Sequence, residues 1–117
     1  MVRNGSRGYG MHSRLLDLLE YRVVLGAVVT TPDGLLVAAA AVPDDDAELI
    51  AATTAAREER EGHDPDYWDA SSEHGSLRVV CGGDVRLIVL TEPDIVEPVI
   101  RELMDEHLRG LEAAIYA

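Results

Sequence analysis

The chain has 117 residues, of which 47% are hydrophobic, and it carries 22 acidic against 10 basic residues. This length suits one domain that buries roughly two thirds of the surface its unfolded chain exposes, so we expect it to fold without disulfides. The formal net charge of -12 repels a phosphate backbone, which argues against nucleic acid as a partner. The chain has a single cysteine, Cys81, and no apolar stretch of about 18 residues. We therefore expect a cytoplasmic protein that does not enter the membrane.

The first ten residues are rich in Gly, Ser and Arg, and we expect residues 1–10 to form a flexible leader. Residues 11–117 are then expected to form the single domain. From Met11 to Glu20 four leucines fall within two turns, which predicts a short amphipathic helix.

The next segment, residues 22–31, is rich in β-branched residues and has apolar side chains on both alternating faces. Such a pattern predicts a strand that is covered above and below. Thr31-Pro32-Asp33-Gly34 supplies Pro and Gly where a turn needs them, so residues 35–40 are expected to return antiparallel.

A helix is predicted from Asp46 to about Glu61, with Asp45 and Glu48 forming an acidic capping box at its start. One face of this helix is built from Ala and Thr side chains, which permit close backbone approach. That composition suits packing on the chain's own sheet and also packing against a second helix.

After a polar loop, residues 67–71 read as a short edge strand. Residues 77–81 form the next strand, Gly82-Gly83 turns the chain, and residues 85–91 are again apolar on both faces. Asp94 is expected to cap a final helix that carries Pro98 in its first turn. The elements predict an α/β (α+β) domain of three layers, with the sheet between helices.

Four short segments carry a resemblance to a known family: Gly26-Ala27-Val28-Val29, Asp33-Gly34-Leu35, Ala47-Glu48-Leu49 and Leu87-Ile88-Val89-Leu90. With the element order, they make residues 13–116 similar to the Roadblock / dynein light chain family. The resemblance implies the order α-β-β-α-β-β-β-α and a five-stranded antiparallel sheet with its first and last strands in the middle. It also implies that the third strand lies at an edge, where two copies pair into a sheet of ten strands.

The same resemblance implies a non-enzymatic homodimeric adaptor that binds a Ras-like small GTPase in bacterial signalling. Two other functions stay open for this domain, a small-molecule-sensing α/β module and a purely structural scaffold. If GTP hydrolysis is stimulated by an arginine supplied in trans, Arg57, Arg60 and Arg101 are the arginines expected on exposed helix faces. Some family members act by reordering the GTPase's own residues, so the resemblance does not require such an arginine. The residues expected at the dimer interface are Ala51, Thr54, Ala55, Glu58, Tyr67, Trp68 and Asp69.

The sequence favours no chemistry of its own. A P-loop needs lysine, which the chain lacks, and the acidic run Asp44-Asp45-Asp46 suits a helix N-terminus better than a calcium loop. No serine lies in a nucleophile elbow, and Cys81 has no base beside it. We therefore expect no catalytic, cofactor-binding or metal-binding residues and no enzyme activity. Zinc-like spacing is also lacking among His63, Asp64, Asp66, Glu73 and His74.

Overall fold

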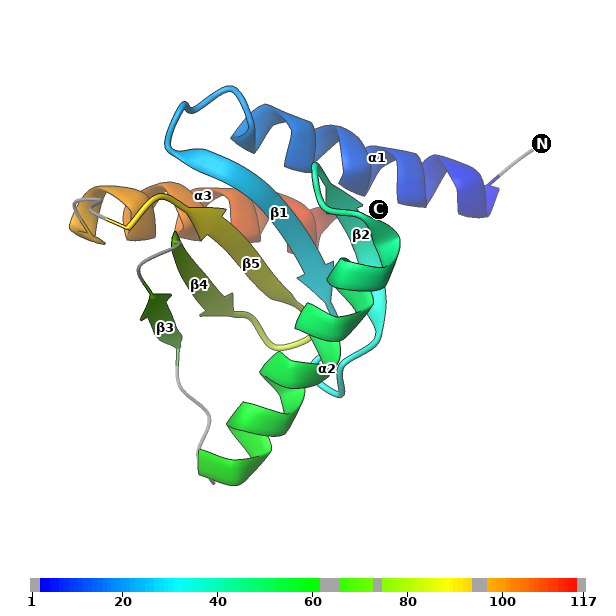
Figure 1. The fold of residues 1–117 in the computed structure, drawn as a ribbon. Coiled ribbons are helices and arrows are strands. Elements are labelled where there is room, and N and C mark those ends of the chain that lie inside the picture. The colour runs from blue at the N-terminus through cyan, green and yellow to red at the C-terminus, as the bar shows by residue number, and fades with distance from the viewer. Residues whose placement is uncertain (1–2, 62–65, 73–74, 94–96, 116–117) are drawn as a thin grey trace.

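The computed structural model of the chain describes residues 3–61, 66–72, 75–93 and 97–115 (Figure 1). Three helices and five strands follow one another in the predicted order, which confirms the α-β-β-α-β-β-β-α arrangement. In chain order the elements are α1 (Arg3–Leu18), β1 (Val24–Thr30), β2 (Leu36–Ala40), α2 (Asp44–Glu61), β3 (Tyr67–Ser72), β4 (Gly75–Cys81), β5 (Arg86–Thr91) and α3 (Glu97–Ile115).

The five strands form one antiparallel sheet in the order β2-β1-β5-β4-β3. Strands β1 and β5 are central, as their apolar composition on both faces predicts, and they lie side by side, as the resemblance implies. The register pairs Val28 with Ile88 and Ala27 with Val89. Successive pairs point to opposite faces of the sheet, so each central strand contributes to two cores.

Helices α1 and α3 cover one face of the sheet and α2 lies on the other, giving three layers (Figure 1). The larger core lies between the sheet and α1 and α3, and includes Met11, Leu15, Leu87, Val89 and Met104. The smaller core lies under α2 and is formed by Val28, Ala47, Val79 and Ile88. Among the described elements, α2 has Cα atoms within 8 Å of β1 and β2 only, so its backbone does not approach the half of the sheet made by β5, β4 and β3.

The turn between β1 and β2 has the predicted form. Gly34 has a φ of 94°, a conformation in which residues with a side chain are strained, and its N–H donates to the carbonyl of Thr31 at 3.0 Å. A Cβ on Gly34 would lie 3.0 Å from the Cβ of Ala55. The glycine therefore allows both the turn and the close approach of helix α2.

Two helix starts differ from the prediction. Helix α1 begins at Arg3, so residues 3–10, expected in the leader, have helical backbone. Three glycines in that stretch weaken the helical signal by about 1 kcal/mol each, which is why the sequence pattern did not indicate it. Helix α2 begins at Asp44, and the first helical bond runs from Ala47 N–H to the carbonyl of Pro43 at 2.9 Å. Asp45 is therefore inside the first turn, and the predicted capping box is wrong.

The cap predicted at Asp94 lies outside the described residues, while Pro98 is the second residue of α3, within its first turn as expected. None of the described helices combines the length and the apolar composition needed to cross a membrane.

Candidate interaction surface

Strand β3 forms one edge of the sheet and presents a regular ladder to its open side. It pairs with β4 without interruption, from Tyr67 opposite Val80 to Ser72 opposite Gly75. The N–H of Cys81 donates to the carbonyl of Asp66 at 2.8 Å, which fixes the alternation of hydrogen bonds along this pair. By that alternation the backbone N–H and C=O groups of Trp68 and Ala70 point toward β4. Those of Tyr67, Asp69 and Ser71 point away from β4, to the open side of the sheet. This side of β3 can accept another strand.

Strand β2, at the opposite edge, is shielded. Its register with β1 shifts between Val29 and Thr30, so that Val37 is an extra residue that bends the strand. Helix α1 packs beside β2, and Nδ1 of His12 lies 3.0 Å from the carbonyl oxygen of Ala39. A bulge and a covering helix are two of the devices that keep an edge from pairing with another chain.

Helix α2 turns one face to its own sheet and the opposite face to solvent. The inward face consists of Ala47, Ala51, Thr54 and Glu58, all buried within the single chain. The outward face carries Leu49, whose side chain is 66% exposed, followed by the exposed Ala52, Thr53 and Ala56. The small outward residues leave room for a second protein element to approach closely.

The seven residues predicted at a dimer interface occupy two places in the structure. Three of them, Ala51, Thr54 and Glu58, are buried against the chain's own sheet. Ala55 is half-buried beside the β1–β2 turn, and the other three lie half-buried along β3. Helical periodicity did not separate the two faces of α2, because small residues occur on both. The interface itself stays a prediction.

Sequence reasoning missed a buried polar cluster under the C-terminal half of α2. Glu58 is 9% exposed, and its Oε1 accepts a hydrogen bond from Nε of Arg86 at 2.9 Å. Its Oε2 accepts from the indole N–H of Trp68 at 2.9 Å and from the Cys81 thiol at 3.5 Å. Arg86 is itself buried and also donates from Nη1 to the carbonyl of Gly82 at 2.6 Å. One carboxylate on α2 thus contacts β3, β4 and β5.

A second polar cluster lies on the other face of the sheet, below α3. Arg78 is 4% exposed and donates to Thr91 Oγ1 at 3.2 Å and to the Tyr67 hydroxyl at 3.1 Å, with an Asp69 carboxylate oxygen 3.9 Å away. The guanidinium of Arg101 stacks over the Tyr67 ring at 4.7 Å. The residues of β3 are therefore fixed from both faces, which keeps the edge straight and ordered.

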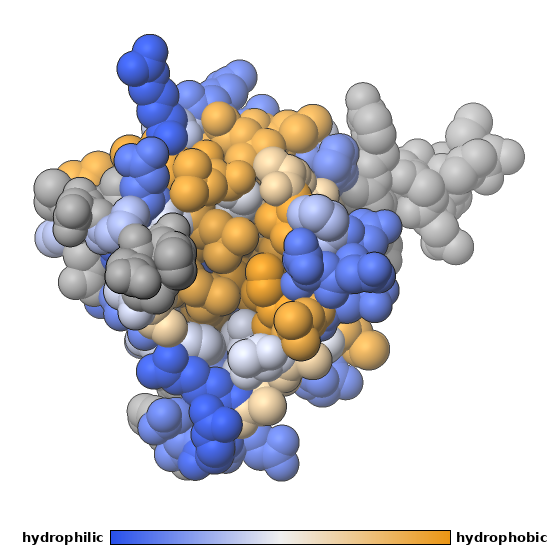
Figure 2. All heavy atoms as spheres, viewed as in Figure 1, coloured by the Kyte–Doolittle hydropathy of each residue, from blue (hydrophilic) through white to orange (hydrophobic). Residues whose placement is uncertain are grey.

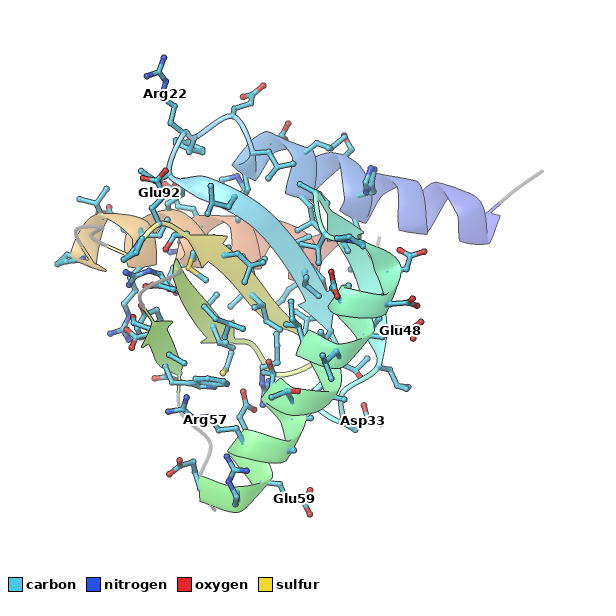
Figure 3. All side chains as sticks on the ribbon, viewed as in Figure 1. Arg22, Asp33, Glu48, Arg57, Glu59 and Glu92 are labelled. Carbon is cyan, nitrogen blue, oxygen red and sulfur yellow. The ribbon has the colours of Figure 1, made fainter. Side chains whose placement is uncertain are left out.

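Three acidic side chains border one side of α2. Asp33, Glu48 and Glu59 lie on the side of the helix away from β3, and Arg57 lies on the side next to it (Figure 3). Arg57 stacks on the Trp68 ring, with its guanidinium carbon 4.3 Å from the ring centre. An acidic border along exposed apolar and small residues favours a partner surface that carries basic groups.

The part of this face that α2 leaves open is apolar. Figure 2 shows hydrophobic side chains gathered in the middle of the face, beside the polar surface of α2. An open hollow of about 470 Å³ lies there. Ser71, Ser76 and Thr91 alternate with the apolar lining residues, so their hydroxyls lie on the other face of the sheet. There the Ser71 and Ser76 Oγ atoms lie 2.9 Å apart and Thr91 Oγ1 accepts from Arg78. This lining suits an apolar protein surface better than a polar small ligand. The lining residues are Leu25, Ala70, Ser71, Gly75, Ser76, Leu77, Leu90 and Thr91.

Metal chemistry finds no support in the part of the chain that the structure describes, where no group of three His, Cys, Asp or Glu residues could hold an ion. His63, Asp64, Glu73 and His74 lie outside the described residues. Cys81 is half-buried, and its thiol donates to Oε2 of Glu58 at 3.5 Å.

Comparison with known proteins identifies the fold. No family model matches the sequence, and no curated protein matches it significantly. Among solved structures, a Roadblock/LC7 domain from Streptomyces avermitilis matches with a TM-score of 0.77 at 18% identity, over 91% of this chain and 98% of that one. A second Roadblock/LC7 domain from the same organism matches at 0.74 and 25% identity, over 86% and 96%. MglB of Myxococcus xanthus matches at 0.69 and 14% identity, over 92% and 86%.

Proposed function

Because this chain is a domain with the Roadblock/LC7 fold, we propose that it pairs with a second copy through β3 and serves as a non-enzymatic adaptor for a Ras-like small GTPase. The observation that carries the proposal is the difference between the two edges of the sheet. Strand β3 presents a regular, uncovered ladder, whereas β2 is bent and lies beside α1. A dimer through β3 also places the two outward faces of α2 on the same side of one continuous sheet.

Pairing through β3 predicts a specific response to proline at position 69. The Asp69→Pro variant removes an N–H that points away from β4, so it spares the β3–β4 ladder and blocks a strand added outside it. We expect dimer affinity to fall by at least about tenfold, since each copy loses a hydrogen bond and gains a ring in the interface. Mass in solution by light scattering over a dilution series measures this.

The matched control is Asp69→Ala, which removes the same carboxylate but keeps the N–H. Both variants lose the contact between the Asp69 carboxylate and Arg78, so a loss of dimer affinity that both share is due to the missing carboxylate. Only the additional loss in Asp69→Pro is due to the missing N–H. A dimer that survives Asp69→Pro as well as it survives Asp69→Ala would rule out pairing through β3.

The outward face of α2 is the proposed docking surface for the GTPase. It combines the exposed Leu49 with small residues and an acidic border that includes Glu48 and Glu59. The complementary surface on the partner would present an apolar side chain flanked by Lys or Arg. Acid-to-base contacts at such a border mainly raise the association rate, so binding should weaken as salt increases.

The deciding experiment mixes the protein with a Ras-like small GTPase, loaded with GDP or with a non-hydrolysable GTP analogue. We expect a complex of two copies of this chain with the GTP-analogue form, measured by size exclusion with light scattering. The same complex should weaken at least about tenfold when Ala52 is replaced by Arg, which places a bulky cation on the docking surface.

Two other results would point elsewhere. A dimer that does not bind the GTPase in either nucleotide state would contradict the adaptor role and favour a structural scaffold. A monomer that binds neither form would contradict the proposal as a whole.

A further inference from the structure

Helix α2 is joined to the edge strand of the sheet through one side chain. Its backbone approaches only β1 and β2 among the described strands, and its C-terminal half runs past the end of the sheet where β3 and β5 begin and β4 ends (Figure 1). Side chains connect the α2 backbone to β5, β4 and β3. Glu58 supplies the hydrogen bonds, and Arg57 adds a stacking contact on Trp68.

Trp68 occupies the position on β3 where this link meets the open edge. It lies between Tyr67 and Asp69, whose backbone groups turn away from β4. The indole is held from two sides, by the Glu58 carboxylate at 2.9 Å and by the Arg57 guanidinium at 4.3 Å. Fixing this side chain therefore restricts the backbone of the two residues that would pair with another strand.

Glu58 can perform this role because its own position is determined. The buried Arg86 holds Oε1, which leaves Oε2 directed at Trp68 and the Cys81 thiol. Hydrogen bonds to an ionised group are roughly twice as strong as bonds between neutral groups. The Glu58–Trp68 bond thus joins β3 to a carboxylate that does not move freely.

We propose that Glu58 is a positioning residue that pre-organises β3, through Trp68, for pairing with a second copy of this chain. An edge strand that is already ordered loses less conformational entropy on pairing, and this lowers the dissociation constant of the dimer without adding a contact to the interface. This inference rests on the proposed dimer through β3. It assigns to a residue buried within one copy a role in self-association.

The test compares dimer dissociation constants, measured by analytical ultracentrifugation, for the wild-type chain, Glu58→Gln, Trp68→Phe and the double variant. Trp68→Phe keeps an aromatic ring under Arg57 but lacks the indole N–H, and it is the more conservative of the two changes. Each single variant is expected to weaken the dimer about tenfold, with no further loss in the double variant because both changes remove the same bond. Glu20→Gln, which changes an exposed acid outside both proposed surfaces, should leave the dimer unchanged.

A purely structural role would give a different result. The unfolding midpoint of the single variants would fall while their dimer dissociation constants stayed at the wild-type value, and this would overturn the inference. The inference would also be overturned if the double variant lost as much dimer affinity as the sum of the two single variants, because the two changes would then act independently. If Glu58→Gln does not fold, Trp68→Phe alone decides between these outcomes. A wild-type chain that is monomeric at all concentrations would overturn the proposed dimer as well, so the two failures are distinguishable.

Discussion

Replacing Arg86 with Ala is expected to lower the free energy of unfolding by about 3–5 kcal/mol, because it leaves the Glu58 carboxylate buried without its cation. Arg86 is 6% exposed and lies 2.9 Å from Glu58, so water cannot readily take the place of the guanidinium. A domain of this size is stable by about 5–15 kcal/mol, which makes the loss a large share of the total. Urea denaturation at one fixed protein concentration measures it.

Two controls separate the buried pair from arginine loss in general. Arg22→Ala removes an exposed arginine, and its effect should stay within about 0.5 kcal/mol. The double variant Glu58→Gln with Arg86→Met removes both charges, so it should recover part of the stability that Arg86→Ala loses. If Arg86→Ala cost less than about 1 kcal/mol, the carboxylate would have to reach solvent, and the buried cluster would not hold α2 in place.

Replacing Ala51 with Arg is expected to destabilise the fold strongly, whereas the same change at the next residue should be tolerated. Ala51 is 1% exposed and faces the sheet, so an arginine there must force the helix away or bury an unpaired charge. The expected loss is about 4 kcal/mol or more. Ala52 is exposed on the outward face, and Arg is nearly as good a helix former as Ala, so Ala52→Arg should change stability by less than about 0.5 kcal/mol.

Circular dichroism followed by urea denaturation distinguishes the two variants. An Ala51→Arg protein as stable as Ala52→Arg would mean that α2 is rotated relative to the orientation described here. This pair of variants also decides how the GTPase-binding test should be built. On α2, a change on the outward face, such as Ala52→Arg, reports on partner binding without disturbing the fold.

The arrangement of the sheet was predictable from the sequence because its strands differ in composition. Segments that are apolar on both faces are expected to lie between two layers, and this pattern predicts central positions for β1 and β5. The mixed composition of residues 67–71 likewise placed β3 at an edge. The Pro-Asp-Gly turn was predictable from the local conformational preferences of its residues alone.

The orientation of α2 was not predictable by the same means. Ala and Thr occur on both of its faces, so no apolar stripe marks the side that meets the sheet. The Glu58–Arg86 pair was hidden for another reason. The two residues are 28 positions apart, and nothing in a chain with 22 acidic residues distinguishes Glu58 as a buried carboxylate. Tertiary packing alone selects it.

The central pairing of β1 with β5 also has a consequence for synthesis of the protein on the ribosome. These two strands come from opposite ends of the domain, at Val24–Thr30 and Arg86–Thr91. The β1–β2 hairpin and α2 emerge first and can fold locally, but one side of β1 has no partner until β5 has been translated. During that interval β1 exposes an apolar, unpaired edge, the kind of surface that chaperones recognise and that aggregates in crowded solutions.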